Sequence, residues 1–219
     1  MSSTLSVPAA LFLLLTKDTG YAEAGSSRRA PLAAGAVTEL ILAGRIELEE
    51  AKNPRVRLLD DAPTGDPALD RVLAAIGQLP GRKLQSLVSH SSLDVTHVIG
   101  RQLCERGVLE EQKGIFSTRY STQEPGPEQA LRRQLAAVLQ EEEPASPRAA
   151  AVLGILRAMD LAHRILREDV PGMGRRAMRD RIEEIARDVP TVDAVRASYQ
   201  AMQTAMMTAV IVPMMMMGS

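Results

Sequence analysis

A helix-like stretch that ends at a glycine and leads into a hairpin pattern is the feature that most restricts the fold of this chain. Residues 31–43 carry apolar side chains at helical spacing, and Gly44 follows them, as glycine often follows the last turn of a helix. Residues 45–49 and 55–58 then alternate between polar and apolar side chains around a turn at 52–54. The pattern predicts a helix followed directly by a β-hairpin between Arg45 and Leu59.

The same order of features returns later in the chain. Residues 93–106 have helical spacing and are followed by Gly107. The stretches 108–111 and 115–118 then have the character of two short strands around a turn at 112–114. We therefore expect one structural unit to occur twice, with the second hairpin between Val108 and Thr118.

Most of the remaining chain also favours helices. Aromatic residues make up only 2% of the chain and Trp is absent, so the core must be built from aliphatic side chains and Met, which favours helix packing. We expect a mainly α fold, a single compact helical domain with short β-hairpins, over residues 5–212, and a low-complexity tail at 213–219. The further predicted helices cover residues 7–16, 68–77, 128–143, 149–167 and 175–188.

Charge and cysteine content indicate a cytoplasmic protein. The formal net charge is −1, so an anion site must come from a local group of basic residues and not from an overall positive charge. The single Cys104 cannot form a disulfide within the chain, which suits a reducing compartment. Residues 5–15 lack the basic start and cleavage site of a signal peptide, and no stretch has the roughly 18 to 20 apolar residues of a membrane span.

Residue patterns typical of enzymes are missing from the sequence. His90, His97 and His163 do not have the spacing of zinc ligands, and no glycine-rich phosphate-binding motif occurs. Asp60 and Asp66 lie in a loop rich in Pro and Gly, where carboxylates usually make local turn bonds. We expect a protein that is not an enzyme and that binds no metal and no cofactor.

The adjacent Arg28 and Arg29 are the basic residues best placed to bind an anion. They lie in a loop rich in Gly and Ser, directly before the predicted helix 31–43. Two guanidinium groups beside a helix N-terminus suit a phosphate. The alternative is a solvated pair on a surface loop, and the sequence leaves both open.

The C-terminal stretch 206–217 is almost wholly apolar, apart from the break at Pro213. Three interpretations remain open for it: a helix that packs on the core, a contact with a second protomer, or a segment that inserts into a membrane. Flexible Met side chains suit an adaptable apolar contact in each case.

Three strings of residues resemble the Golgi phosphoprotein 3 family. Residues 39–48 are similar to its step from the first long helix into a strand. Ala62-Pro63-Thr64-Gly65-Asp66, followed by Leu69-Asp70, is similar to its loop after the first hairpin. Residues 103–109 are similar to the entry into its second hairpin. The resemblance covers about residues 5–122, with a looser match of apolar helices to the C-terminus.

The resemblance implies a fold and a function. The fold is a compact, mainly α-helical domain that carries short hairpins. Eukaryotic members of the family bind phosphatidylinositol 4-phosphate on Golgi membranes and hold glycosyltransferases there. A sequence rich in Ala, Arg and Asp and poor in aromatic residues indicates a bacterial, actinobacterial-type member. By resemblance, we expect a peripheral membrane-binding adaptor at the inner face of a membrane, with an anionic lipid headgroup and a membrane-protein client as its partners.

The headgroup ligands of the family have no counterparts here. The family uses a Trp before the first long helix, an Arg within that helix, and two Arg three residues apart ahead of the second hairpin. In this chain, the helix position falls near Ala33 and the later pair falls near Leu93 and Thr96. We expect a substitute anion site made of Arg28, Arg29 and Arg101, which lie near the matching segments.

The second hairpin is the expected element of self-association. Leu109, Ile115 and Phe116 place apolar side chains on a ribbon that two strands alone could not stabilise in water. The ribbon must therefore pack on its own domain or on another protomer. The family uses this hairpin to form homo-oligomers, which supports the second alternative without excluding the first, and both stay open.

A winged-helix nucleic-acid-binding protein is the alternative function. Such a protein also has a helix followed by a hairpin, and Arg45, Arg55 and Arg57 would lie on the first wing. A recognition helix is normally basic, whereas residues 31–43 contain no Lys or Arg. Binding of nucleic acid is therefore the less favoured interpretation.

Overall fold

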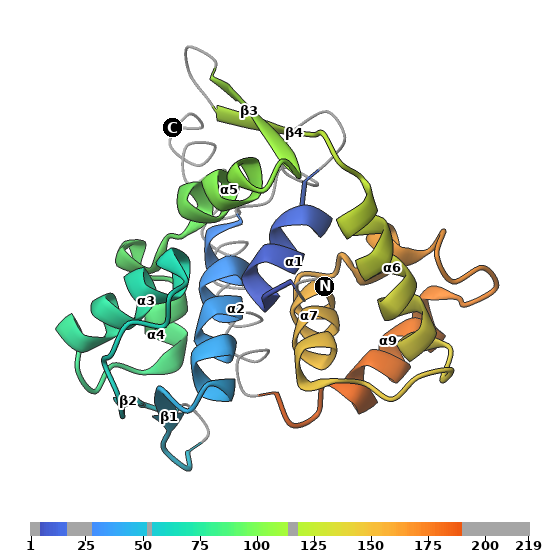
Figure 1. Cartoon of the computed structure of the whole chain (residues 1–219). Coiled ribbons are helices and arrows are strands. Elements are labelled where there is room, and N and C mark those ends of the chain that lie inside the picture. Colours follow the sequence, from blue (N-terminus) through green and yellow to red (C-terminus); the bar gives the residue numbers. More distant parts are fainter. Residues whose placement is uncertain (1–4, 17–27, 52–53, 114–117, 190–219) are drawn as a thin grey trace, which may run out of the picture.

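The computed structural model describes residues 5–16, 28–51, 54–113 and 118–189, and all structural statements refer to these residues. Helices dominate the fold, with two small antiparallel sheets of two strands each. Figure 1 shows the hairpin β1–β2 and the hairpin β3–β4 at opposite ends of the molecule, with α2 running between them. The predicted mainly α fold with short hairpins is therefore confirmed.

Helices α1 (Val7–Leu14) and α2 (Arg29–Leu42) form the centre of the molecule. They run antiparallel, because Val7 lies beside Glu39 while Leu15 lies beside Arg28. Gly35 allows the close approach: a Cβ atom at this position would lie 3.1 Å from the Leu11 side chain. Every residue of α1 is buried, which explains why its sequence is apolar all round.

The first helix–glycine–hairpin unit agrees with the prediction. Gly44 follows α2 with a φ of +66°, a left-handed conformation that favours glycine. Strands β1 (Ile46–Leu48) and β2 (Val56–Leu58) then pair antiparallel, with Ile46 opposite Leu58. Ile46 and Val56 are buried and attach the hairpin to the core.

The second unit differs from the prediction at its start. Helix α3 (Pro67–Gln78) leads to the short α4 (Leu84–Val88) and a 3-10 turn (Ser91–Leu93), and α5 is Thr96–Glu105. The expected helix 93–106 is therefore wrong in its first turn. The physical reason is local: the Asp94 carboxylate accepts a hydrogen bond from the Thr96 backbone N–H at 3.0 Å, an arrangement that starts a helix.

The second hairpin is longer than predicted and lies further along the chain. Strand β3 (Leu109–Lys113) pairs with β4 (Thr118–Thr122), with Glu111 opposite Tyr120. The predicted turn at 112–114 is wrong at Gln112 and Lys113, which belong to β3, and the return strand pairs from Thr118 onward. Residues 114–117 of the predicted turn and strand lie outside the described residues. The return strand is attached to the core by Tyr120, which is 2% exposed.

The second half of the chain is helical, as predicted, but its helices are shorter. One predicted helix, 149–167, is two helices, α7 (Pro147–Ala158) and α8 (Ala162–Leu166). The break lies at Asp160, whose φ of 60° is left-handed, and its carboxylate accepts a hydrogen bond from Arg175. The other two helices are α6 (Gly126–Leu139) and α9 (Arg175–Ile185).

A single cluster of buried apolar side chains runs from Val7 to Ala186 and is shared by all the helices. Helix α1 contacts α2, α5, α6 and α7, so it lies at the centre of this cluster. The apolar stretch 206–217 and the tail 213–219 lie outside the described residues. The three interpretations of that stretch therefore remain predictions.

Candidate functional site

Arg28 joins the beginning of α2 to the end of α1. Its guanidinium lies over the ring of Phe12, with 4.9 Å between Cζ and the ring centroid. Its Nε also donates a hydrogen bond of 3.2 Å to the backbone oxygen of Leu15. Burial lowers the pKa of Arg28 from its ordinary value, although the group remains a cation at neutral pH. The core beneath Arg28 thus holds in place the side chain that was predicted to bind an anion.

Tyr120 brings the second hairpin onto the same core. Its ring meets that of Phe12 edge-on, at 5.3 Å between centroids and an interplanar angle of 79°. Gly100 of α5 allows this approach, since a Cβ atom there would lie 2.4 Å from Cζ of Tyr120. The Tyr120 hydroxyl lies 3.4 Å from Nδ1 of His97. An aromatic pair therefore connects α1, α5 and β4 directly below Arg28.

Arg101 follows Gly100 on α5 and is exposed. Burial is the main cause that raises the pKa of Tyr120, and Glu111 and the thiol of Cys104 raise it further. The positive charges of Arg28 and Arg101 lower this pKa and so oppose the rise. Gly100, the neighbour of Arg101, packs against Tyr120, whose ring contacts Phe12 beneath Arg28. These two predicted ligands, which lie far apart in the sequence, thus belong to segments that meet at one aromatic pair.

Arg29, the third predicted ligand, is exposed and is the first residue of α2. Arg28 is the N-cap residue and supplies no side-chain hydrogen bond to the first turn, which also contains no acidic residue. The N-terminus of α2 thus presents backbone N–H groups and two guanidinium groups at one end of a helix of 14 residues. This end attracts anions.

Acidic residues limit the cationic area on the side of the second hairpin. Glu111 and Glu110 are exposed on β3. Burial is the largest cause that raises the pKa of Cys104, and the charges of these two carboxylates raise it further. The surface of β3 is therefore acidic here, whereas the first turn of α2 carries no acidic residue.

The positions that correspond to the family's headgroup ligands are structural here. Ala33 and Leu93 are both fully buried in the core, and Thr96 is the half-buried first residue of α5. None of them could present a cation without a change of residue type. Arg28 and Arg29 lie at the same end of α2 as Ala33.

The predicted residues of the self-association site fall into two groups. Leu109 is 3% exposed and belongs to the core, so it offers no surface to a second protomer. Ile115 and Phe116 lie outside the described residues. Tyr120, the hairpin residue that packs on the core, was not predicted, because it lies beyond Thr118, where the second strand was expected to end.

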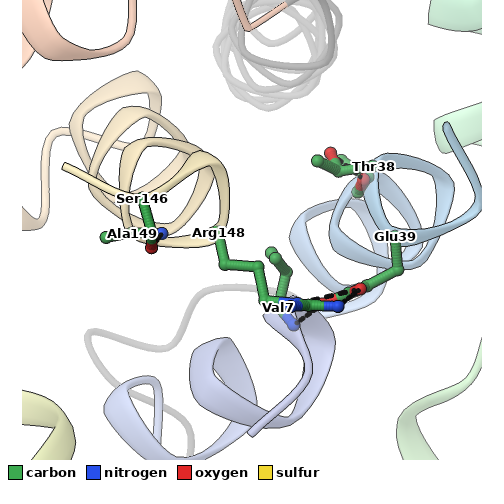
Figure 2. Close-up of polar contacts among 7 residues, drawn as sticks. Val7, Thr38, Glu39, Ser146, Arg148 and Ala149 are labelled. Carbon is green, nitrogen blue, oxygen red and sulfur yellow. Dashed lines mark hydrogen bonds and ion pairs between the residues drawn. The ribbon is translucent and has the colours of Figure 1, made fainter. Parts of the chain in front are cut away.

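A second polar feature was not predicted. Glu39 of α2 is buried, and its carboxylate accepts hydrogen bonds from the backbone N–H of Val7 at 2.7 Å and from Arg148 of α7 at 2.8 Å. Figure 2 shows the Arg148 side chain reaching from α7 to this carboxylate beside the start of α1. A signal was present, because Glu39 is the sole charged residue within the apolar stretch 31–43.

The loop carboxylates make the local bonds expected of them. Asp60 accepts a hydrogen bond from the Ala62 N–H at 2.9 Å, and Asp66 accepts one from the Ala68 N–H at 2.8 Å at the start of α3. Within the described residues, no group of three His, Cys, Asp or Glu side chains could hold a metal ion. In the same part of the chain, no helix is both long and apolar enough to cross a membrane.

Comparison with known proteins gives one match. The family model described as Golgi phosphoprotein 3 (GPP34) matches residues 7–202. This match covers nearly the whole chain, including both hairpins and every described helix. The search among curated proteins found no match.

Proposed function

Because the chain belongs to the Golgi phosphoprotein 3 family, we propose that it is a peripheral membrane-binding adaptor without enzymatic activity. Its ligand would be the anionic headgroup of a membrane lipid, either phosphatidylinositol 4-phosphate, as the resemblance implies, or another anionic lipid. The face that binds it would be the start of α2 with the neighbouring surface of α5.

One observation supports the proposal more than any other. Arg28 is held over Phe12 at the N-terminus of α2, and Tyr120, which packs edge-on against Phe12, also packs against Gly100, the neighbour of Arg101 on α5. A guanidinium fixed by packing loses little conformational entropy when it binds a phosphate. Near a membrane, each basic residue contributes on the order of 1 kcal/mol of attraction to anionic lipids.

The first hairpin gives less support to the winged-helix alternative. Arg45 and Arg57 form ion pairs with Asp60 and Glu47, and Arg55 donates a hydrogen bond to the backbone oxygen of Gly81. Cations that are already paired with carboxylates release fewer counterions from nucleic acid when they bind it. A gel-shift experiment with random duplex DNA would support this alternative if the protein shifted the duplex at low salt and the shift disappeared as salt was added.

Vesicle flotation tests the proposed function. The wild type is mixed with neutral phosphatidylcholine vesicles, with vesicles that also carry phosphatidylserine, and with vesicles that carry phosphatidylinositol 4-phosphate at the same total charge. We expect flotation with the anionic vesicles alone. A preference for the third composition identifies the headgroup, and equal flotation with both anionic compositions indicates charge alone.

The matched variants are Arg101→Glu and Arg133→Glu. Both positions are exposed on helices, and both changes alter the charge equally, but Arg133 lies on α6, away from the start of α2. We expect Arg101→Glu to weaken vesicle binding by roughly tenfold or more and Arg133→Glu to leave it unchanged. Absence of the wild type from every vesicle fraction would refute membrane docking, and equal losses in the two variants would refute the assigned face.

We also propose two partners beyond the lipid. A membrane-protein client would follow from an adaptor role at the inner, cytoplasmic face of a membrane. Self-association through the tip of the second hairpin would increase the avidity of membrane binding, because two docking faces would act together.

A further inference from the structure

A cavity of about 530 Å³ lies between the start of α1, helices α6 and α7, and the base of the second hairpin. We propose that this cavity binds a long-chain fatty acid, with the alkyl chain inside and the carboxylate beside Arg106 and Arg148. The proposal does not depend on the membrane-docking function, which uses the start of α2 and the side of α5 that carries Arg101.

The walls of the cavity favour an alkyl chain. Its size lies within the range of about 300 to 1,000 Å³ typical of small-molecule sites, which are mostly apolar with a few polar groups. The side chains that form most of the wall are aliphatic. They come from the N-terminal segment, the base of β3, α6 and α7, and they include Leu5, Val7, Val108, Leu131, Leu135 and Val152.

The charges on the lining favour an anion at one end of that chain. Arg106 and Arg148 both line the cavity, and no acidic side chain does so among the described residues. Arg106 is exposed and makes no ion pair within the described part of the chain. An apolar cavity whose charged groups are all cations matches a ligand that is apolar along its length and negative at its head.

Arg148 is oriented before any ligand binds. Its Nε and Nη2 donate to the two carboxylate oxygens of Glu39, at 2.8 and 3.0 Å, and its side chain is 50% exposed. Its third nitrogen, Nη1, has no hydrogen bond among the described residues. In Figure 2 the guanidinium extends from α7 toward the beginning of α1 and is held there by Glu39. Both N–H groups of Nη1 therefore remain for a ligand.

The position of α7 adds to this attraction. Ser146, its N-cap residue, and Ala149, in its first turn, also line the cavity, so the positive end of the dipole of this helix of 12 residues faces the same space. A phosphatidyl lipid would need room for two chains, whereas a fatty acid needs room for one. A carboxylate with a single chain is therefore the ligand class that fits both the walls and the charges.

The experiment measures binding of dodecanoate and tetradecanoate by titration calorimetry, below their micellar concentrations and without vesicles. We expect saturable binding of one molecule per chain, with affinity rising on the order of tenfold for the two added methylene groups. The methyl ester of dodecanoate, which lacks the charge, should bind at least tenfold more weakly. No saturable binding, or equal binding of acid and ester, would overturn the proposal.

Two pairs of variants locate the site. Ala130 lines the cavity and is exposed, so Ala130→Trp should fill the cavity and abolish binding, whereas Gln129→Trp, one position away on α6 and outside the lining, should not. Arg106→Ala should weaken binding of the acid by roughly tenfold, and Arg133→Ala should leave it unchanged. These positions are exposed, and thermal unfolding of each variant checks that it folds.

The test also separates this inference from the proposed function. Arg101→Glu, which should lose vesicle binding, should bind dodecanoate like the wild type. If Ala130→Trp and Gln129→Trp bind dodecanoate equally, the site is not in this cavity, whatever the vesicle experiment shows.

Discussion

Arg148 of α7 forms a two-pronged ion pair with Glu39 of α2, with Nε 2.8 Å from Oε1 and Nη2 3.0 Å from Oε2. The two partners lie in different surroundings, because the Glu39 side chain is 5% exposed and that of Arg148 is 50% exposed. Glu39 also accepts the backbone N–H of Val7 at 2.7 Å. The carboxylate therefore joins three helices, and it depends on Arg148 to balance its buried charge.

The ion pair should respond unequally to loss of its two partners. Arg148→Ala leaves a buried carboxylate without a counterion, and we expect it to lower the free energy of unfolding by about 3 kcal/mol. Glu39→Gln keeps an oxygen for the Val7 N–H and releases an arginine that can reach water, so about 1 kcal/mol should be lost. Urea denaturation of both variants checks the order, and a larger loss for Glu39→Gln would contradict it.

The control for this comparison is Arg175→Ala. Arg175 pairs with Asp160 at 2.5 Å, but both side chains are more than 60% exposed. An exposed pair of this kind contributes at most about 1 kcal/mol. A loss as large as that of Arg148→Ala would show that burial of the carboxylate is not the cause.

Two glycine-to-alanine changes should have opposite effects on stability. Alanine is favoured over glycine within helices by about 1 kcal/mol. At Gly100 the added Cβ would lie 2.4 Å from a Tyr120 ring that is packed against Phe12, so the clash should outweigh this gain and cost about 1 to 3 kcal/mol net. At Gly77 of α3 the nearest atom is Leu58 Cδ2 at 3.6 Å, an ordinary contact, so alanine should stabilise. Thermal unfolding of the two variants measures both, and stabilisation by Gly100→Ala would contradict the close contact.

Tyr120 should make stability depend on alkaline pH. Burial, with the charge of Glu111, raises the pKa of its phenol above the ordinary value near 10. The folded chain then keeps this proton while the unfolded chain loses it, so the contribution is complete below the unfolded pKa and decreases as the pH rises past it. The slope from this one group is at most about 1.4 kcal/mol per pH unit.

The variant Tyr120→Phe isolates that effect. It keeps the ring between Phe12 and Gly100 but removes the titrating hydroxyl and its contact with His97. We expect the free energy of unfolding of the variant to fall less steeply above pH ~10 than that of the wild type. Parallel curves for the two proteins would show that Tyr120 titrates equally in the folded and unfolded states.

The role of the second hairpin in assembly is best tested by a point change among residues 114–117, which join its two strands in the sequence. Deletion of the whole hairpin would also remove Tyr120 and Leu109, which are buried, and would therefore damage the core. We expect the wild type to sediment as an oligomer and Phe116→Ser to sediment as a monomer with unchanged thermal stability. Glu110→Gln on β3 serves as the control. A monomeric wild type at high concentration would refute self-association.

The sequence by itself determined the helical class and the first hairpin unit. Helical spacing of apolar residues and the glycine after it depend on backbone preferences over a few residues. Gly44 and Gly107 both have positive φ, at 66° and 72°, as their places after two helices predicted. The short strands around residues 52–54 followed from alternation alone.

Tertiary structure decided the features that join distant residues. The position of Arg28 over Phe12 and the edge-on contact of Tyr120 with Phe12 both depend on side chains from other elements. Glu39 stood out in the sequence as a charge in an apolar helix, but its partner Arg148 lies 109 residues away. The reason is that local propensities act over one or two turns of the chain, whereas a buried charge is balanced by whichever cation the packing of the helices brings beside it.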